Sequence, residues 1–416
     1  MKNLQLLIIP LLVFISCEET EETDVELGEY HLFTATFEEG EFSDDVTSFI
    51  FITDGDGNVL ADSSFIGAAS FELFADTSLS LPPDKIGVTT VTKLGEHFEI
   101  ITNLGIDKGS QWTWYNPYYS PEEIGQSYYT FTNIPDDLRS VIISSNGHSR
   151  TAFINDNDTY ELSHYESLED VLIMCLLNDG SAIYKFVQGV SVGETHSVDF
   201  SGFSVSNQTI MNNNSDLNCD YSQLWGYDSN DSFIQYKRHR LYYGGGEGIS
   251  WDSNQNFIFN YPPELGKFRT IAYVGDGWGT TGGKNWSQGT AGEIPTTFEK
   301  IDADISVINS EINNFEVNLT GTFDQWGINL RNSEASGDWI VYISPSIDNG
   351  KLPSFPTSIS NEYPELLRQD FIMNSVTVTD WLCAENYEEW HDLYFYTDGY
   401  YLDFCSGYRN LIHWLD

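Results

Sequence analysis

The sequence predicts an all-β fold made of tandem antiparallel β-sandwich modules of the Ig-like kind. Short apolar runs recur along the chain and are separated by Gly, Asn and Asp, which favour turns between antiparallel strands. Aromatic residues, which favour strands, make up 15% of the 416 residues. Helical periodicity is scarce, so alternating strand–helix units are not expected.

Three pairs of apolar runs are expected to form hairpins. They are residues 48–53 with 59–62, 171–177 with 182–187, and 393–397 with 400–404. Each connection is rich in Gly, Asp or Asn, which accept the positive φ of tight turns. Further strands are expected in 305–319 and at 339–343, whereas 364–371 predicts one or two helical turns that begin at a proline.

Changes of composition divide the chain into predicted segments. They are a signal peptide at 1–16, a tether at 17–26, sandwich modules at 27–116 and 126–203, and one larger sandwich unit or two modules at 220–416. A tyrosine-rich stretch between two prolines separates the two modules, and an Asn-rich polar tract precedes the last unit. No repeat of fixed period is visible, which disfavours solenoids and propellers.

The charge of the chain argues against two classes of partner. There are 63 acidic and 18 basic residues, which give a formal net charge of −45. Nucleic-acid binding depends on clustered Lys and Arg, so no nucleic-acid partner is expected. Docking of a basic patch on anionic lipid is not expected for the same reason.

The first 17 residues carry the most specific signal in the sequence. Lys2 is their only charge, and an apolar run too short to span a bilayer as a mature helix ends at Ser16-Cys17. This end resembles the lipobox of bacterial lipoproteins, in which the cysteine thiol receives a diacylglycerol and a peptidase cuts before it. The resemblance implies lipid attachment at Cys17, and hence a membrane as partner. The alternative is an ordinary secretory signal with a coincidental cysteine.

An acidic stretch from Glu18 to Asp24 follows directly. Such a block cannot bury or pair its charges, so we expect an extended tether. It is similar to the export signal of surface lipoproteins of the Bacteroidota, which implies an outer-membrane protein that faces the cell exterior. The alternative is an anchor that faces the periplasm. That group includes glycan-binding proteins, but none of their ligand-contact motifs is visible here.

Four cysteines remain after Cys17, and three pairings of them are open. Cys383 and Cys405 are close enough in sequence to staple the last strands together. Cys175 lies in a uniformly apolar run and is expected to be a buried free thiol.

Motifs for catalysis and metal binding are weak. The sequence has no nucleophile elbow, zinc-protease motif or phosphate-binding loop, so it assigns no catalytic residue. Asp54, Asp56 and Asn58 have the spacing that opens a calcium loop, and 155–158 is similarly rich in oxygen ligands. Position 12 of the first loop is Phe65 rather than Glu, so a hairpin tip is the preferred interpretation and calcium the alternative.

Aromatic residues in glycine-rich segments are the candidate ligand-binding residues. Trp278 and Trp286 flank one such segment, Tyr242 and Tyr243 precede three glycines, and Trp251 follows soon after. Exposed rings among loop residues are suited to stacking on sugars. The alternative is that the rings fold back as lids on the sandwich.

Residues 237–240 gather three basic side chains beside this segment. The preferred interpretation is an internal counter-charge patch, and the alternative is a site for an anionic ligand.

Three functional hypotheses follow. The first is a lipid-anchored, non-catalytic surface protein that binds a polysaccharide through loop aromatics. The second is an adhesion or assembly protein that binds a surface protein and uses the sandwiches as spacers. The third is a glycosidase that depends on a pair of carboxylates.

Overall fold

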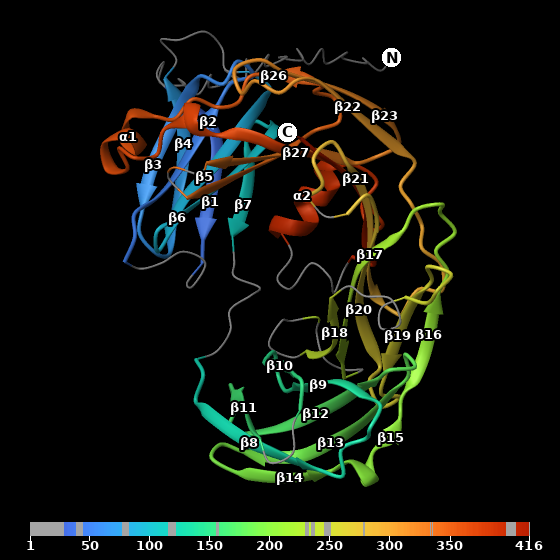
Figure 1. The fold of residues 1–416 in the computed structure, drawn as a ribbon. Helices are drawn as coiled ribbons and strands as arrows, with labels where there is room; N and C mark the ends of the chain where they lie inside the picture. The colour runs from blue at the N-terminus through green and yellow to red at the C-terminus, as the bar shows by residue number, and fades with distance from the viewer. Residues whose placement is uncertain are drawn as a thin grey trace, which may run out of the picture.

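The computed structural model confirms the all-β fold, built of packed sheets whose strand pairs are mostly antiparallel (Figure 1). Parallel pairs are β1 with β7, β8 with β14 and β6 with β25. It describes residues 29–38, 45–76, 83–114, 122–154, 158–228, 233, 238–244, 251–277, 279–332, 334, 336–396 and 405–415. The predicted signal peptide and tether, including Cys17, lie outside these residues. In the described part of the chain, no helix is long and apolar enough to cross a membrane.

A sheet of twelve strands runs through most of the molecule. Its order is β18 (His239–Gly244), β17 (Cys219–Tyr227), β20 (Lys267–Gly275), β21 (Lys284–Gly292), β28 (Gly407–Trp414), β27 (Ile372–Trp381), β24 (Gln325–Asn332), β25 (Gly337–Ile343), β6 (His97–Asp107), β5 (Lys85–Leu94), β2 (Ser48–Thr53) and β3 (Val59–Phe65). Neighbours are antiparallel except β25 and β6, which are parallel. This pairing corrects the predicted division, because segments 27–116 and 220–416 share one sheet.

The half of the long sheet that includes β25, β6, β5, β2 and β3, which we call the upper half, is covered on both faces (Figure 1). One cover is the sheet of β4 (Ala69–Asp76), β1 (Glu29–Phe37) and β7 (Ser110–Trp114), and the other is that of β22 (Ala303–Asn309), β23 (Phe315–Gly321) and β26 (Asn349–Gly350). Two cores therefore lie back to back across the sheet. All six residues of β2 are buried, as expected for a strand between two layers.

The lower sandwich has its own pair of sheets. One holds β11 (Thr159–His164), β8 (Gly125–Thr132) and β14 (Thr195–Asp199); the other holds β10 (Ser149–Ala152), β9 (Leu138–Ser144), β12 (Leu168–Leu177), β13 (Ala182–Ser191) and β15 (Ser204–Val205). Alternate residues of β12 enter different cores: Val171 and Ile173 pack inside the sandwich, whereas Leu172 and Met174 pack toward the long sheet. This position explains the uniform apolar run. Cys175 on this strand is a buried thiol, as expected.

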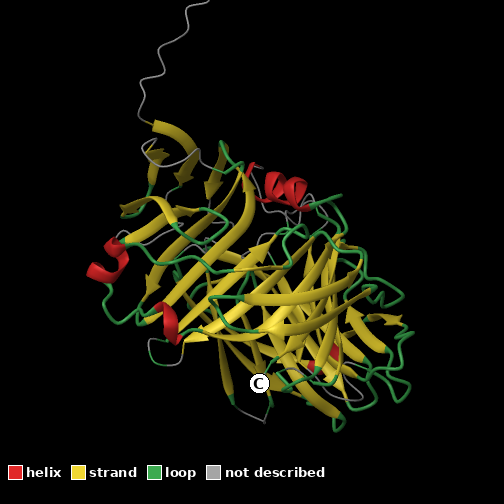
Figure 2. Ribbon diagram, turned by 90° about the horizontal axis from the view of Figure 1, so that it is seen from above, coloured by secondary structure: helices red, strands yellow, loops and turns green. Residues whose placement is uncertain are grey.

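In the lower half of the long sheet, a small sheet covers the face that we call the outer face. A two-stranded sheet of β16 (Asn207–Met211) and β19 (Phe257–Tyr261) lies on the outer side (Figure 1). Seen from above, strands make up the body of the molecule and the few helices lie near its margins (Figure 2).

The predicted hairpin at 393–404 is wrong in its first half. Residues Tyr387–Tyr396 form helix α2, and 397–404 lie outside the described residues. The Asn386 side chain accepts a hydrogen bond from the backbone N–H of Glu389 at 2.9 Å, which stabilises the helix start. Tyr387 and Phe395 share one buried helix face, and that face packs on the core beside β1 and β7.

The prediction of helical turns in 364–371 is only partly met. In 364–371 the structure has a 3-10 turn at Arg368–Asp370, and helix α1 lies earlier, at Thr357–Glu362. A second 3-10 turn is at Phe200–Gly202.

Candidate ligand-binding face

The aromatic residues predicted to bind a ligand do not form a stacking platform in the described structure. Trp278 and the side chains of Tyr242 and Tyr243 lie outside the described residues. Trp251 is 9% exposed and belongs to the core beneath β17 and β20. Trp286 is half-buried and packs against the same core, with the Lys300 ammonium 4.5 Å from its ring centroid. The prediction for Trp251 and Trp286 is therefore corrected.

Strand register explains the place of Trp286. It lies on β21 opposite Val274 on one neighbour and Leu411 on the other, both fully buried. Cross-strand partners point to the same face, so Trp286 faces the outer core.

Residues one position along these strands point the other way and form what we call the inner face. Its members are Tyr221, Gln223, Trp225, Tyr227, Lys267, Arg269, Ile271, Tyr273, Ser287, Tyr408, Asn410 and Trp381. Most of the aromatic, amide and charged members are half-buried, whereas Trp225 and Tyr227 are buried. In Figure 1 strands β17, β20 and β21, which carry much of this face, have α2 on one side and β16 and β19 on the other.

Two aromatic pairs lie across neighbouring strands of the inner face. Tyr221 and Tyr273 meet edge to face at a centroid distance of 5.7 Å, and so do Trp381 and Tyr408. Trp390 of α2 stacks on Trp381 at 3.6 Å with an interplanar angle of 7°. The rings hold one another in fixed orientations, which lowers the entropy lost when a ligand stacks.

Hydrogen-bonding groups accompany the rings. The Gln223 side-chain N–H donates to the Tyr221 hydroxyl at 2.6 Å, and the Trp381 indole N–H donates to Gln325 at 3.1 Å. Ser287 Oγ and Asn410 Oδ1 are buried and have no hydrogen-bond partner among the described residues. The Gln223 amide and the Tyr221 hydroxyl therefore supply polar groups beside the half-buried rings, as sugar recognition requires.

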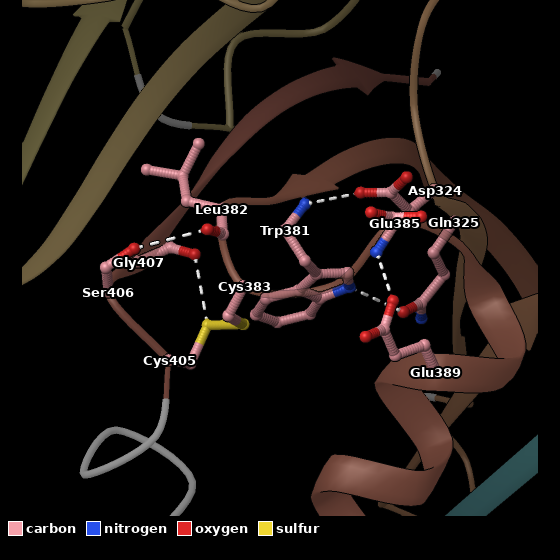
Figure 3. The surroundings of a disulfide bond; sticks show 10 residues. All are labelled: Asp324, Gln325, Trp381, Leu382, Cys383, Glu385, Glu389, Cys405, Ser406 and Gly407. Carbon is pink, nitrogen blue, oxygen red and sulfur yellow. Dashed lines mark hydrogen bonds between the residues drawn. A yellow bond between two sulfur atoms is a disulfide. The ribbon is translucent and has the colours of Figure 1, made fainter.

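The disulfide between Cys383 and Cys405 lies beside this face, and it joins the two cysteines that the sequence placed together (Figure 3). It closes a loop of sequence separation 22 that carries α2. The N–H of Leu382 donates to the carbonyl of Gly407 at 2.9 Å next to it. The bridge thus fixes Trp381, Tyr408 and the ring of Trp390 relative to one another.

A group of acidic residues lies beside Trp381. The carboxylate of Asp324 accepts the backbone N–H of Trp381 at 2.8 Å (Figure 3). Burial, with the nearby charges of Asp380 and Glu389, raises the pKa of Asp324 above its usual value. Arg409 pairs with Asp380 and with Glu299, which lowers the cost of gathering these acids. Because Asp324 holds the Trp381 backbone, we assign it a positioning role.

The oxygen-rich turn at Asp54 is a hairpin tip. One carboxylate oxygen of Asp54 accepts the backbone N–H of Asp56 at 2.9 Å and of Asn58 at 2.8 Å. The other accepts the side-chain N–H of Asn58 at 2.9 Å. The carboxylate thus caps its own turn. The second oxygen-rich stretch, 155–158, lies mostly outside the described residues.

One further constellation, in the lower sandwich, has the arrangement of a hydrolase triad. Ser127 Oγ lies 2.6 Å from His164 Nε2, and His164 Nδ1 lies 3.1 Å from Glu169. Glu169 also accepts the backbone N–H groups of Tyr165 and Glu166 at 2.7 Å. Ser127 and His164 are 0% exposed and Glu169 is 3% exposed, so a substrate cannot reach the serine in this structure. We assign the three residues to the packing of the sandwich.

Comparison with known proteins adds little to this geometry. No family model matches the chain, and no curated protein matches its sequence. Among solved structures, the Bacillus anthracis TIE protein is similar at 11% identity and a TM-score of 0.15, over 87% of this chain and 70% of that one. A 1.5-MDa bacterial ice-binding adhesin is similar at 9% identity and a TM-score of 0.12, over 62% of this chain and 88% of that one. Neither likeness is close enough to transfer a function.

Proposed function

We propose that this protein is a lipid-anchored, non-catalytic surface protein that binds a polysaccharide on the inner face. The observation that carries the proposal is the set of rings on one face, Tyr221 with Tyr273 and Trp381 with Tyr408. The buried ring of Trp390 on α2 stacks on Trp381 and holds its orientation. Polar side chains lie beside the rings on neighbouring strands: Ser287 is the cross-strand partner of Tyr273, and Asn410 is that of Ser287. Rings flanked by amides and hydroxyls stack on sugar faces and bond their hydroxyl groups.

Binding to a glycan array, followed by titration of the best ligand, tests the proposal. Trp381→Ala removes a central ring and is expected to weaken binding about 3- to 10-fold, the value of one aromatic contact. Tyr408→Ala should act in the same direction. Phe153→Ala is the matched control, because Phe153 is 81% exposed and lies in the lower sandwich, away from the inner face. Silence of the wild-type protein across the array would end the proposal, and capture of a surface protein instead would favour the adhesion hypothesis.

The anchoring part of the proposal rests on Cys17 and needs its own test. Wild-type protein should partition with membranes, and Cys17→Ala should release it to the soluble fraction, because the variant lacks the thiol that would carry the acyl chains. Protease treatment of intact cells then decides which side of the outer membrane the protein faces. Protein that stays intact on intact cells but is cut after lysis would contradict exposure at the surface.

A further inference from the structure

The lower sandwich presents a polar sheet surface that no other described part of the chain covers. It belongs to the sheet of β11, β8 and β14, whose opposite side packs on the core of the sandwich. We call this surface the β8 face; its central members are Gln126, Tyr128, Thr130, Thr159, Thr195 and Ser197. Each of them is exposed or half-buried, whereas Ser127, Tyr129 and Phe131, which alternate with them on β8, are buried. Figure 1 shows this sheet at the lower end of the molecule, below β12 and β13.

Strand register places Tyr128 at the centre of the β8 face. Its cross-strand partners are Glu161 on β11 and Thr195 on β14. Gln126 and Thr130 lie two positions away along β8 and point the same way. Tyr128 is 36% exposed, and no ring contact, hydrogen bond or ion pair engages its side chain among the described residues. The ring is therefore open to a ligand that stacks on it.

Hydrogen-bonding groups that the fold does not use surround this ring. The side chains of Gln126, Thr195 and Ser197 make no hydrogen bond within the described part of the chain. The Thr130 hydroxyl lies 3.5 Å from the carbonyl oxygen of His196, at the limit of a hydrogen bond. One amide and several hydroxyl groups thus offer donors and acceptors to a ligand that lies on Tyr128.

The charge of the β8 face differs from that of the whole chain. The formal net charge is −45, yet the only charged neighbour of Tyr128 in its row is Glu161, which pairs with Arg150 at 3.2 Å. At the end of β14, Asp199 accepts a hydrogen bond from the Asn133 side chain at 3.0 Å. A nucleic acid would need clustered cations, and a protein partner would need an apolar centre. The β8 face has neither among its described residues, so it fits an uncharged ligand rich in hydroxyl groups.

We infer that the β8 face is a second glycan-binding site, at which a neutral saccharide stacks on Tyr128 and forms hydrogen bonds with Gln126 and Thr195. It goes beyond the proposed function, because it is a different site and does not need the inner face to bind. A polysaccharide long enough to reach both sites binds more tightly than it does to either site alone, because the second contact is intramolecular.

Affinity electrophoresis through gels that contain dextran, galactomannan or mixed-linkage β-glucan tests the inference. We expect at least one of these neutral polysaccharides to retard the wild-type protein. Tyr128→Ala should weaken that binding about 3- to 10-fold, the value of one aromatic contact, whereas Tyr128→Phe should retain most of it. Tyr128→Ala combined with Trp381→Ala should weaken binding more than either change alone.

Tyr30→Ala is the matched control, because Tyr30 is also 36% exposed but lies on β1, away from the lower sandwich. It should leave the retardation unchanged. Unchanged binding in Tyr128→Ala, or a wild-type dimer that Tyr128→Ala dissociates, overturns the inference and leaves the proposed function standing. Weaker binding in Tyr128→Ala with none lost in Trp381→Ala supports the inference and contradicts binding at the inner face. No retardation in any gel overturns the inference, and the glycan array alone then decides the proposed function.

Discussion

The inner face and the buried triad of the lower sandwich both bring polar side chains together, yet they differ in access. Ser127, His164 and Glu169 have hydrolase-like distances and almost no exposed surface. Trp381, Tyr408 and Arg269 have no catalytic pattern, but each is half-buried at the surface of an inward-curving sheet. Distances between functional groups therefore identify a site only together with a route for the ligand.

The pKa values of the buried carboxylates in these two regions are shifted in opposite directions. Burial by itself raises the pKa of Glu169, but contact with His164 and the backbone N–H of Glu166 outweigh burial, and the pKa lies below its usual value. At Asp324, burial and neighbouring carboxylates act in the same direction and raise the pKa. Contacts therefore stabilise the charged form of Glu169, whereas burial and like charges disfavour the charged form of Asp324.

The largest expected effect is a loss of stability on substitution of Glu169, without a change in ligand binding. Glu169→Gln leaves His164 and two backbone N–H groups without their charged partner, and should lower the free energy of unfolding by about 3–5 kcal/mol in urea titration. Glycan affinity per folded molecule should not change. Glu194→Gln, on an exposed turn of the same sandwich, is the control and should stay within about 0.5 kcal/mol. A Glu169 variant of normal stability would contradict our assignment of the triad to packing.

Opening the disulfide should affect the inner face as well as stability. Replacing Cys383 and Cys405 together by Ser frees a loop of sequence separation 22, and should cost about 3 kcal/mol of unfolding free energy. Glycan binding should weaken too, because Trp390 then stacks less often on Trp381. Reduction of the wild-type protein with a thiol should reproduce both changes. Unchanged binding in the reduced protein would show that the stapled loop does not order this face.

Acid should destabilise the region where the lower sandwich meets the long sheet. Burial lowers the pKa of His148 and of His239, so protonation favours the unfolded chain, in which both have ordinary values. Stability should hold above about pH 6.5 and fall as the pH drops below it, as measured by denaturant titration from pH 8 to pH 5. His148→Gln and His239→Gln together should make this fall less steep, and the rest of it should come from His391 and His413, whose pKa values burial also lowers. A flat wild-type profile would contradict the prediction.

Asp324 should show the smallest effect, of opposite sign. Because its pKa is raised in the fold, its contribution to stability improves as the pH falls toward and through that pKa. Asp324→Asn keeps an acceptor for the Trp381 N–H and removes the unfavourable charge, so it should stabilise the protein at pH 7 by up to about 1 kcal/mol. Thermal melts at pH 7 and pH 4 compare the variants, and destabilisation at pH 7 would show that the charge is needed.

Much of the fold follows from local patterns, and the site does not. The hairpin at Asp54 is visible in the sequence because turn chemistry is local. Trp286 was expected in a loop, but its face is set by strand register against Leu411, which no local pattern reveals. The inner-face tyrosines look like ordinary strand residues, since alternation is the same whether a face meets a core or solvent. Helix α2 was missed because its aromatic content favours strands, while its buried face depends on Trp112 far away in the chain.

The parallel pairing of β25 with β6 affects how the chain folds. The Trp339 indole N–H donates to Thr102 across 237 positions of sequence. At cellular synthesis rates, the earlier strand waits on the order of tens of seconds for its neighbour, and its edge is open to wrong partners meanwhile. Maturation should therefore be slow and dependent on holding factors, and fragments cut before position 337 should aggregate rather than fold.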